Sequence, residues 1–227
     1  MKYLPVQLNL KDRRVLVVGG GRVAERKIQT LLEYTDTLTV VAPEVTDGIN
    51  ALVAGGRLCH HKRKFKKSDL TGIDCVFTTV DDPTVSRFVY TESKALNILV
   101  NTADVPALCD FILPATVRRG DLSISVSTNG VCPAVARRLR EKLADQYSQE
   151  YAVLVALMGE IRAAAIQNRK TDQDIAQQLH GFLEELAPLL TWIKQKDPGP
   201  ICQRIARFFD FEIDVALVLA RTGGHEA

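Results

Sequence analysis

Three consecutive glycines, Gly19, Gly20 and Gly21, begin the first stretch of the chain whose residue types and spacing could bind a ligand. Residues 19–24 follow the pattern G-x-G-x-x-A. Glycine at the first position lets the chain turn sharply off a strand, and glycine at the third lets backbone N–H groups approach a pyrophosphate. A helix starting there presents its partial positive charge to the same phosphates. The pattern predicts a dinucleotide-binding turn, with a glycine-rich structural turn as the alternative.

The end of the second strand, which is expected to contact the ribose, differs from the usual pattern of dinucleotide-binding folds. Many dinucleotide-binding folds carry Asp or Glu at the end of the second strand, where the carboxylate binds the ribose hydroxyls. Here that strand ends at Ala42, and Pro43 and Glu44 follow, so the carboxylate comes two residues late. No arginine is obviously placed for a 2′-phosphate. The sequence therefore favours NAD over NADP.

Asp104, at the end of residues 101–104, is the second candidate for chemistry. Ligands of doubly wound sheets bind beyond the carboxyl ends of the strands, so we expect Asp104 to face the cofactor crevice. A carboxylate beside a nicotinamide ring can act as a general base. The alternative is an aspartate that only caps a loop.

The third candidate site combines small hydroxyl residues with a basic helix. Ser127 and Thr128 precede a segment that carries Arg137, Arg138 and Arg140. Such groups could bind the carboxylates of an acidic ligand. The alternative is a helix N-cap followed by a solvated basic face. Cys109, beside an aspartate, could indicate metal or redox chemistry, although an isolated cysteine is more often a small buried apolar residue.

These candidates need a scaffold of alternating strands and helices. Apolar, β-branched runs predict strands at residues 14–18, 38–42, 57–61, 75–80 and 98–101. Helical periodicity is found at 23–32 and 84–95, with Asp81 and Asp82 as cap candidates. The alternation predicts an α/β fold, a Rossmann-type doubly wound parallel sheet.

Beyond residue 110 the pattern changes. Residues 111–117 and 122–127 predict a hairpin with a turn at Gly120 and Asp121, and a cationic helix follows at Pro133–Gln146. The rest of the chain predicts helices at 151–167, 172–190 and 201–209.

Composition limits the classes of function. The chain has 227 residues and a net charge of +2, which gives no global field for nucleic acid or an anionic membrane. No apolar run is long enough to span a bilayer, and the first residues lack the apolar core of a signal peptide. Five scattered cysteines indicate reduced thiols, and no pair has metal-ligand spacing. We expect a cytoplasmic protein with no resident metal, no nucleic-acid partner and no membrane partner.

Several motifs occur in order along roughly the first 145 residues, at positions 4–6, 17–27, 101–104, 109–115, 124–133 and 136–143. Together they resemble the precorrin-2 dehydrogenase and sirohydrochlorin ferrochelatase family, the N-terminal module of siroheme synthases. The resemblance implies NAD-dependent oxidation of precorrin-2 to sirohydrochlorin, on the route to siroheme. Some members also insert Fe²⁺ into sirohydrochlorin.

The resemblance also implies an organisation and a set of site residues. It predicts an NAD-binding Rossmann domain at 1–113, a dimerisation segment at 114–146 that forms a homodimer, and a small helical domain at 147–227. Asp104 is the implied catalytic residue. The implied ligand contacts are Gly19, Gly21, Arg22, Val23, Pro43 and Glu44 for the cofactor, and Ser127, Thr128 and Arg137 for the substrate.

This chain departs from the family pattern at two positions. Asn129 stands where glycine is usual, and Val105 follows Asp104 where small or acidic residues are common. Neither change removes a group that the chemistry needs. The competing hypothesis is a regulatory NAD-binding module without tetrapyrrole turnover, which would need the glycine turn but not Asp104.

Overall fold

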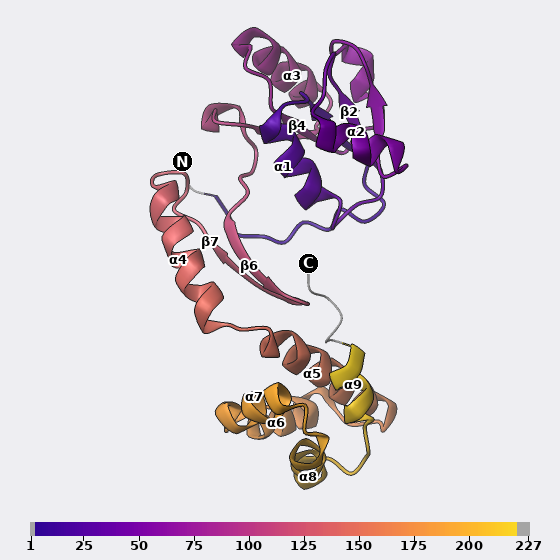
Figure 1. Ribbon diagram of the computed structural model, residues 1–227, viewed down its shortest axis with the longest axis vertical. Coiled ribbons are helices and arrows are strands. Elements are labelled where there is room, and N and C mark those ends of the chain that lie inside the picture. Colours follow the sequence, from indigo (N-terminus) through magenta and orange to yellow (C-terminus); the bar gives the residue numbers. More distant parts are fainter. Residues whose placement is uncertain (1–2, 222–227) are drawn as a thin grey trace. The chain divides into compact units, whose positions relative to one another are not determined.

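The computed structural model describes residues 3–221, and the chain divides into two compact units (Figure 1). The first unit ends at Leu113 and the second begins at Pro114. The predicted domain limits at residues 1 and 227 lie outside the described residues. None of the helices between residues 3 and 221 combines the length and apolarity that a membrane span requires.

The first unit is built on a five-stranded parallel sheet with the strand order β3-β2-β1-β4-β5. The parallel, crossover-connected order confirms the predicted α/β fold of the Rossmann type. The strands are β1 (Val15–Val18), β2 (Leu38–Val41), β3 (Cys59–His61), β4 (Cys75–Thr78) and β5 (Leu99–Thr102).

Helices cover both faces of this sheet (Figure 1). In β1, Val15 and Val17 pack towards α1 and α2, while Leu16 and Val18 pack towards α3. A strand buried on both faces explains the continuous apolar run in the sequence. The helices are α1 (Arg22–Leu31), α2 (Asp47–Ala54) and α3 (Pro83–Ala95), with short 3₁₀ turns at Lys67–Leu70 and Pro106–Leu108.

The sequence located the five strands, α1 and α3, but not α2 or the two 3₁₀ turns. The predicted N-cap Asp82 is confirmed, because its carboxylate accepts the Thr84 N–H at 2.8 Å. Helix α2 was not predicted, and its Thr46 cap accepts the Ile49 N–H. The 3₁₀ turn Lys67–Leu70 begins at the end of a run of basic residues, and its Asp69 pairs with Arg63 at 2.6 Å.

The second unit begins with the predicted hairpin, formed by β6 (Ala115–Arg119) and β7 (Leu122–Val126). Gly120 occupies its turn with φ 56°, which glycine adopts without steric cost. Helix α4 (Pro133–Gln146) has the predicted bounds and packs on the hairpin. Arg119 donates to the carbonyls of Ala144 and Tyr147 at 2.8 and 2.7 Å, so it caps the end of α4.

The remaining helices form a separate apolar core, and here one prediction is wrong. Residues 172–190 do not form one helix, because α6 ends at Leu183 and α7 begins at Leu186. Pro188 explains the break, since it has no N–H to donate to the carbonyl of residue 184 and its ring would collide with that carbonyl. The helices are α5 (Glu150–Gln167), α6 (Asp172–Leu183), α7 (Leu186–Gln195), α8 (Pro198–Phe208) and α9 (Val215–Arg221).

A buried arginine joins α6 and α8 in this core. Arg204 is only 7% exposed, and its Nε donates to the Phe182 carbonyl at 2.9 Å while Nη1 donates to Glu185 at 2.8 Å. The guanidinium group also lies 5.6 and 5.7 Å from the ring centroids of Phe182 and Phe208. These contacts satisfy a charge that would otherwise be costly to bury.

We therefore expect Arg204→Ala to destabilise this core by about 2–4 kcal/mol, because the change opens a cavity and leaves the Phe182 carbonyl without its donor. Trp192, the only tryptophan of the chain, packs against the same core and reports on its unfolding by fluorescence. A urea titration should show a lower midpoint for Arg204→Ala and an unchanged midpoint for the exposed control Arg162→Ala. Equal midpoints for the two variants would contradict the role of Arg204.

Candidate active site

The glycine turn joins the end of β1 to the start of α1, and its first two glycines are required by the protein's own packing. Gly19 has φ 116°, and a Cβ there would lie 2.8 Å from the Thr79 carbonyl oxygen. A Cβ on Gly20 would collide with the carbonyl oxygen of Glu44. Side chains at these two positions would therefore push β1 away from the loops after β4 and β2.

The contact at Gly20 brings the predicted cofactor residues together. The Thr46 N–H donates to the Gly20 carbonyl at 3.0 Å, which holds the loop containing Pro43 and Glu44 against the glycine turn. Pro43 and Glu44 are both exposed, as are Arg22 and Val23 at the start of α1. These residues share the carboxyl edge of the sheet, where doubly wound folds bind their ligands.

Gly21 differs from its two neighbours. Its φ of −80° is open to any residue, and a Cβ built on it meets no atom within 4 Å. Neither backbone conformation nor packing among the described residues therefore requires glycine there. Gly21 is also the N-cap of α1 and supplies no side chain to cap the first helical N–H groups. Open space beside free helix donors is what a nucleotide pyrophosphate needs, so these residues fit the predicted cofactor.

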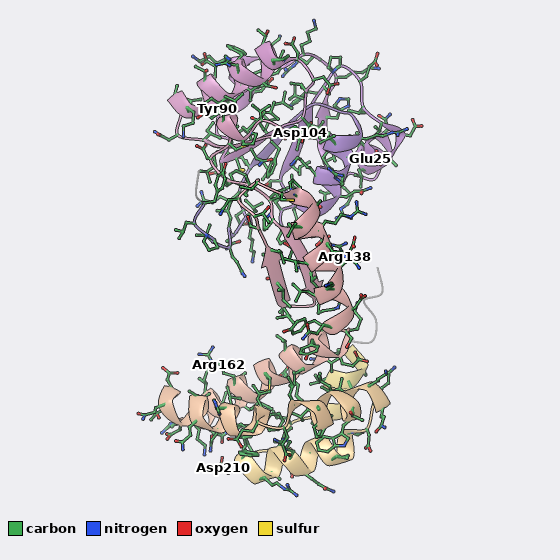
Figure 2. The ribbon with its side chains drawn as sticks, turned by 90° about the vertical axis from the view of Figure 1, so that its left-hand side faces the viewer. Glu25, Tyr90, Asp104, Arg138, Arg162 and Asp210 are labelled. Atoms are coloured by element: carbon green, nitrogen blue, oxygen red, sulfur yellow. The ribbon has the colours of Figure 1, made fainter. Side chains whose placement is uncertain are left out.

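Asp104 lies in the turn directly after β5 (labelled in Figure 2). The Ala103 N–H donates to the Thr78 carbonyl at 2.8 Å, so the turn leaves the sheet beside the end of β4. Asp104 has φ 58° and is exposed. A residue with a Cβ in the left-handed region is uncommon, and Asp and Asn are the types that adopt it most readily. The exposed carboxylate thus lies at the same edge of the sheet as the glycine turn.

The chain then folds back along the outer edge of β5. The Asp110 N–H donates to the Val100 carbonyl at 2.8 Å, and the Val100 N–H donates to the Asp110 carboxylate at 3.0 Å. The Cys109 thiol accepts the Thr102 N–H at 3.2 Å and lies 3.1 Å from the Thr102 carbonyl. Burial raises the pKa of the Cys109 thiol. This thiol has a structural role in pairing the sheet edge, which the sequence alone did not indicate.

Lys27, on the buried side of α1, is a residue that sequence reasoning missed. Its ammonium group donates to the Asn101 side-chain oxygen at 3.0 Å and lies 5.7 Å from the Phe77 ring centroid. Burial is the main cause that lowers the Lys27 pKa; the nearby Arg26 also lowers it, whereas Cys109 and Asp104 raise it. The available signal was the helical spacing of Lys27 from Ala24, Ile28 and Leu31, the buried residues of α1.

The predicted substrate residues belong to the second unit. The Ser127 hydroxyl accepts the Asn129 N–H, and the Thr128 hydroxyl accepts the Cys132 N–H, each at 3.1 Å. Both hydroxyl protons therefore remain for donation to a ligand. Asn129 has φ 51°, which explains why glycine suits this position and why asparagine can replace it.

The basic face of α4 follows this loop (Arg138 is labelled in Figure 2). Arg137 contacts Glu141 at 3.1 Å, and Arg138 and Arg140 approach the same carboxylate at 3.6 and 3.5 Å. The hydrogen bond from Arg137 is the main cause that lowers the Glu141 pKa. One carboxylate cannot neutralise three guanidinium groups, so α4 keeps a net positive charge. Within residues 3–221, no group of three or more potential metal-ligating side chains is found.

The contrast between Gly20 and Gly21 can be tested by substitution. Gly21→Ala should leave thermal stability unchanged, because the added methyl group meets nothing, but should weaken NAD⁺ binding by about tenfold or more. Gly20→Ala should instead lower the melting temperature, because its methyl group meets the Glu44 carbonyl. Calorimetric titration with NAD⁺ and thermal melts would measure both effects. Undiminished NAD⁺ affinity in Gly21→Ala would show that the phosphates bind elsewhere.

Comparison with known families matches both units of the chain. Residues 6–115 match a family model described as "Putative NAD(P)-binding", and residues 119–146 match the central model of sirohaem biosynthesis proteins. The siroheme synthase of Methylobacillus flagellatus is 39% identical over 173 residues, which cover 76% of this chain and 37% of that protein. The siroheme synthase of Nitrosococcus oceani is 33% identical over 224 residues, which cover 99% of this chain and 45% of that protein. The chain thus spans less than half the length of these relatives.

A solved structure matches over its full length. SirC, described as a precorrin-2 dehydrogenase, is 30% identical with a TM-score of 0.71, and the match covers 91% of this chain and 100% of SirC. The family model and this likeness together support a nicotinamide cofactor, without distinguishing NAD from NADP. The chain therefore belongs to the precorrin-2 dehydrogenase family, which is shared with the siroheme synthases.

Proposed function

We propose that this chain oxidises precorrin-2 to sirohydrochlorin in siroheme biosynthesis, with NAD⁺ as the hydride acceptor. The observation that carries the proposal is the joint position of Gly21 and Asp104. A glycine turn with open space beside Gly21 and an exposed carboxylate share the carboxyl edge of one parallel sheet. The likeness to SirC over its whole length supports the same reaction.

The reaction removes a hydride and a proton from the macrocycle. A nicotinamide ring bound at the glycine turn would supply the hydride acceptor. Asp104 is placed to accept the proton as its carboxylate, and its exposure lets it pass that proton to water. Precorrin-2 and NAD⁺ thus give sirohydrochlorin, NADH and a proton, so atoms and electrons balance.

The second unit supplies groups suited to the acidic side chains of the tetrapyrrole. Ser127 and Thr128 offer hydroxyl donors, and Arg137 offers a guanidinium group that can bind a carboxylate. Arg119 is not among the proposed ligands, because two of its nitrogens donate to the carbonyls at the end of α4 and hold the side chain there.

NAD rather than NADP is the proposed cofactor. Glu44 is exposed just beyond the end of β2, where its carboxylate would repel a 2′-phosphate and could accept a ribose hydroxyl. The His60 ring nitrogen Nε2 lies 2.9 Å from the Ala42 carbonyl and so helps to hold the strand end before Pro43.

Turnover by the purified chain is the direct test. With precorrin-2 and NAD⁺ under anaerobic conditions, we expect NADH and sirohydrochlorin to form together, with slower turnover on NADP⁺. Asp104→Ala and Asp104→Asn should lose at least about a hundredfold in kcat, because both remove the base. Both variants should bind NAD⁺ with unchanged affinity in a calorimetric titration.

Each part of this assay can contradict the proposal. Tight NAD⁺ binding without any turnover by the unmodified chain would favour the regulatory module instead. Normal turnover by Asp104→Asn would show that Asp104 is not the base, although the chain would still catalyse the proposed reaction.

We also propose that the chain forms a homodimer through residues 114–146. Three apolar side chains are left exposed near or on α4: Val131 at 86%, Val135 at 48% and Leu139 at 43%. Val135 and Leu139 are spaced four residues apart and so share a helix face. Apolar side chains grouped in this way favour burial against a second copy, as the family resemblance implies.

Leu139→Glu should therefore shift the protein towards monomer, because the partner copy would have to bury a carboxylate. Sedimentation velocity over a range of protein concentrations would measure the shift. The exposed Leu217→Glu, in α9, serves as the control and should leave the association unchanged. A sedimentation coefficient for Leu139→Glu identical to that of the unmodified chain would place the interface elsewhere.

A further inference from the structure

We propose that Lys27 is a positioning residue that ties the cofactor-binding helix α1 to the turn carrying Asp104. The inference rests on the proposed function for its consequence in catalysis. Its structural part, the anchoring of residues 103–111 by Lys27, can be tested without any turnover.

The first argument is the unusual environment of the ammonium group. Lys27 is half-buried, and the acceptor that it uses is the neutral side-chain oxygen of Asn101, at 3.0 Å. Withdrawing an ammonium group from water is costly, and a neutral amide offsets less of that cost than a carboxylate would. A methionine or leucine would fill the same space beside Phe77 without this penalty. The hydrogen bond to Asn101 is therefore what distinguishes lysine from an apolar residue here.

The second argument is the other hydrogen bond of the Asn101 side chain. Its side-chain nitrogen donates to the Phe111 carbonyl at 2.9 Å, while its oxygen accepts from Lys27. Asn101 is the penultimate residue of β5, and Phe111 comes after the chain has returned along that strand. A single amide thus joins the two ends of the loop that contains Asp104, and Lys27 fixes the orientation of that amide. Sequence position alone would not connect α1 to this loop.

The third argument is that α1 begins at the phosphate cradle. Gly21 caps the helix, and Ala24 packs on the sheet with no exposure at all. Lys27 therefore extends from a helix whose position is already fixed relative to the cofactor. Through Asn101 it sets the distance between that helix and the Asp104 turn. A small displacement of a base from its reacting proton is costly in rate, so this link bears on kcat rather than on cofactor affinity.

The test compares Lys27→Met with a matched control, Lys67→Met. Lys67 pairs with Glu92 at 2.6 Å on the other side of the sheet, so the control also removes an ammonium group and breaks its contact with a partner. We expect Lys27→Met to lower kcat by roughly tenfold or more, with the KM for NAD⁺ within about twofold of the unmodified chain. Lys27→Arg should recover most of the rate, because its guanidinium can still donate to Asn101. The control should match the unmodified chain.

A second readout measures the loop itself. Hydrogen–deuterium exchange of the peptide covering residues 99–111 should be faster in Lys27→Met than in the unmodified chain, and unchanged in Lys67→Met. Asn101→Leu should speed the same exchange, and the double variant Lys27→Met with Asn101→Leu should exchange no faster than Asn101→Leu alone. If Lys27→Met does not fold, the same comparison is made with Lys27→Gln.

The outcomes separate this inference from the proposed function. If the unmodified chain fails to oxidise precorrin-2, the proposed function is wrong, while the exchange data still decide the role of Lys27. Unchanged exchange over residues 99–111 in Lys27→Met would overturn the link. So would additive effects in the double variant, or a loss of NAD⁺ affinity that accounts for the whole loss of rate.

Discussion

The outer edge of β5 is the constraint on which the candidate site depends. An edge strand in a parallel sheet presents unpaired N–H and C=O groups, which must be satisfied or exposed to water. Here residues 109–111 satisfy them from the side, with a thiol and a carboxylate replacing the backbone acceptors of a sixth strand. Because the chain must return to this edge after β5, it forms a short closed loop. Asp104 lies at the start of that loop, in a conformation that a continuing strand could not adopt.

The two units contribute different kinds of group. The first unit carries the glycine turn, the loop after β2 and the Asp104 turn, all at one edge of a rigid sheet. The second unit carries hydroxyl and guanidinium groups on a hairpin, a loop and α4. Under the proposed function, the cofactor chemistry belongs to the packed scaffold of the first unit and the recognition of an acidic ligand to exposed residues of the second.

Local sequence signals predicted the parts of the fold that local physics determines. The apolar run before Gly19 and the proline at the start of α4 have meaning without knowledge of the tertiary structure, and both elements were located closely. The prediction of a single helix over residues 172–190 was wrong because the apolar periodicity continues through Pro188, whereas the helical hydrogen bonding cannot. The contacts that Lys27 and Cys109 make were missed for another reason. Their partners lie 74 and 7 residues away, so only the folded chain shows what they bind.

The left-handed backbone at Asp104 has a consequence for how this position can evolve. Glycine would adopt φ 58° without the steric cost that any Cβ incurs there, so a change to glycine relaxes the turn by about 1 kcal/mol. If Asp104 is the base that we propose, position 104 is a site where an unstrained backbone and catalysis are in conflict. Consensus or stability-guided redesign of this chain should therefore hold position 104 fixed.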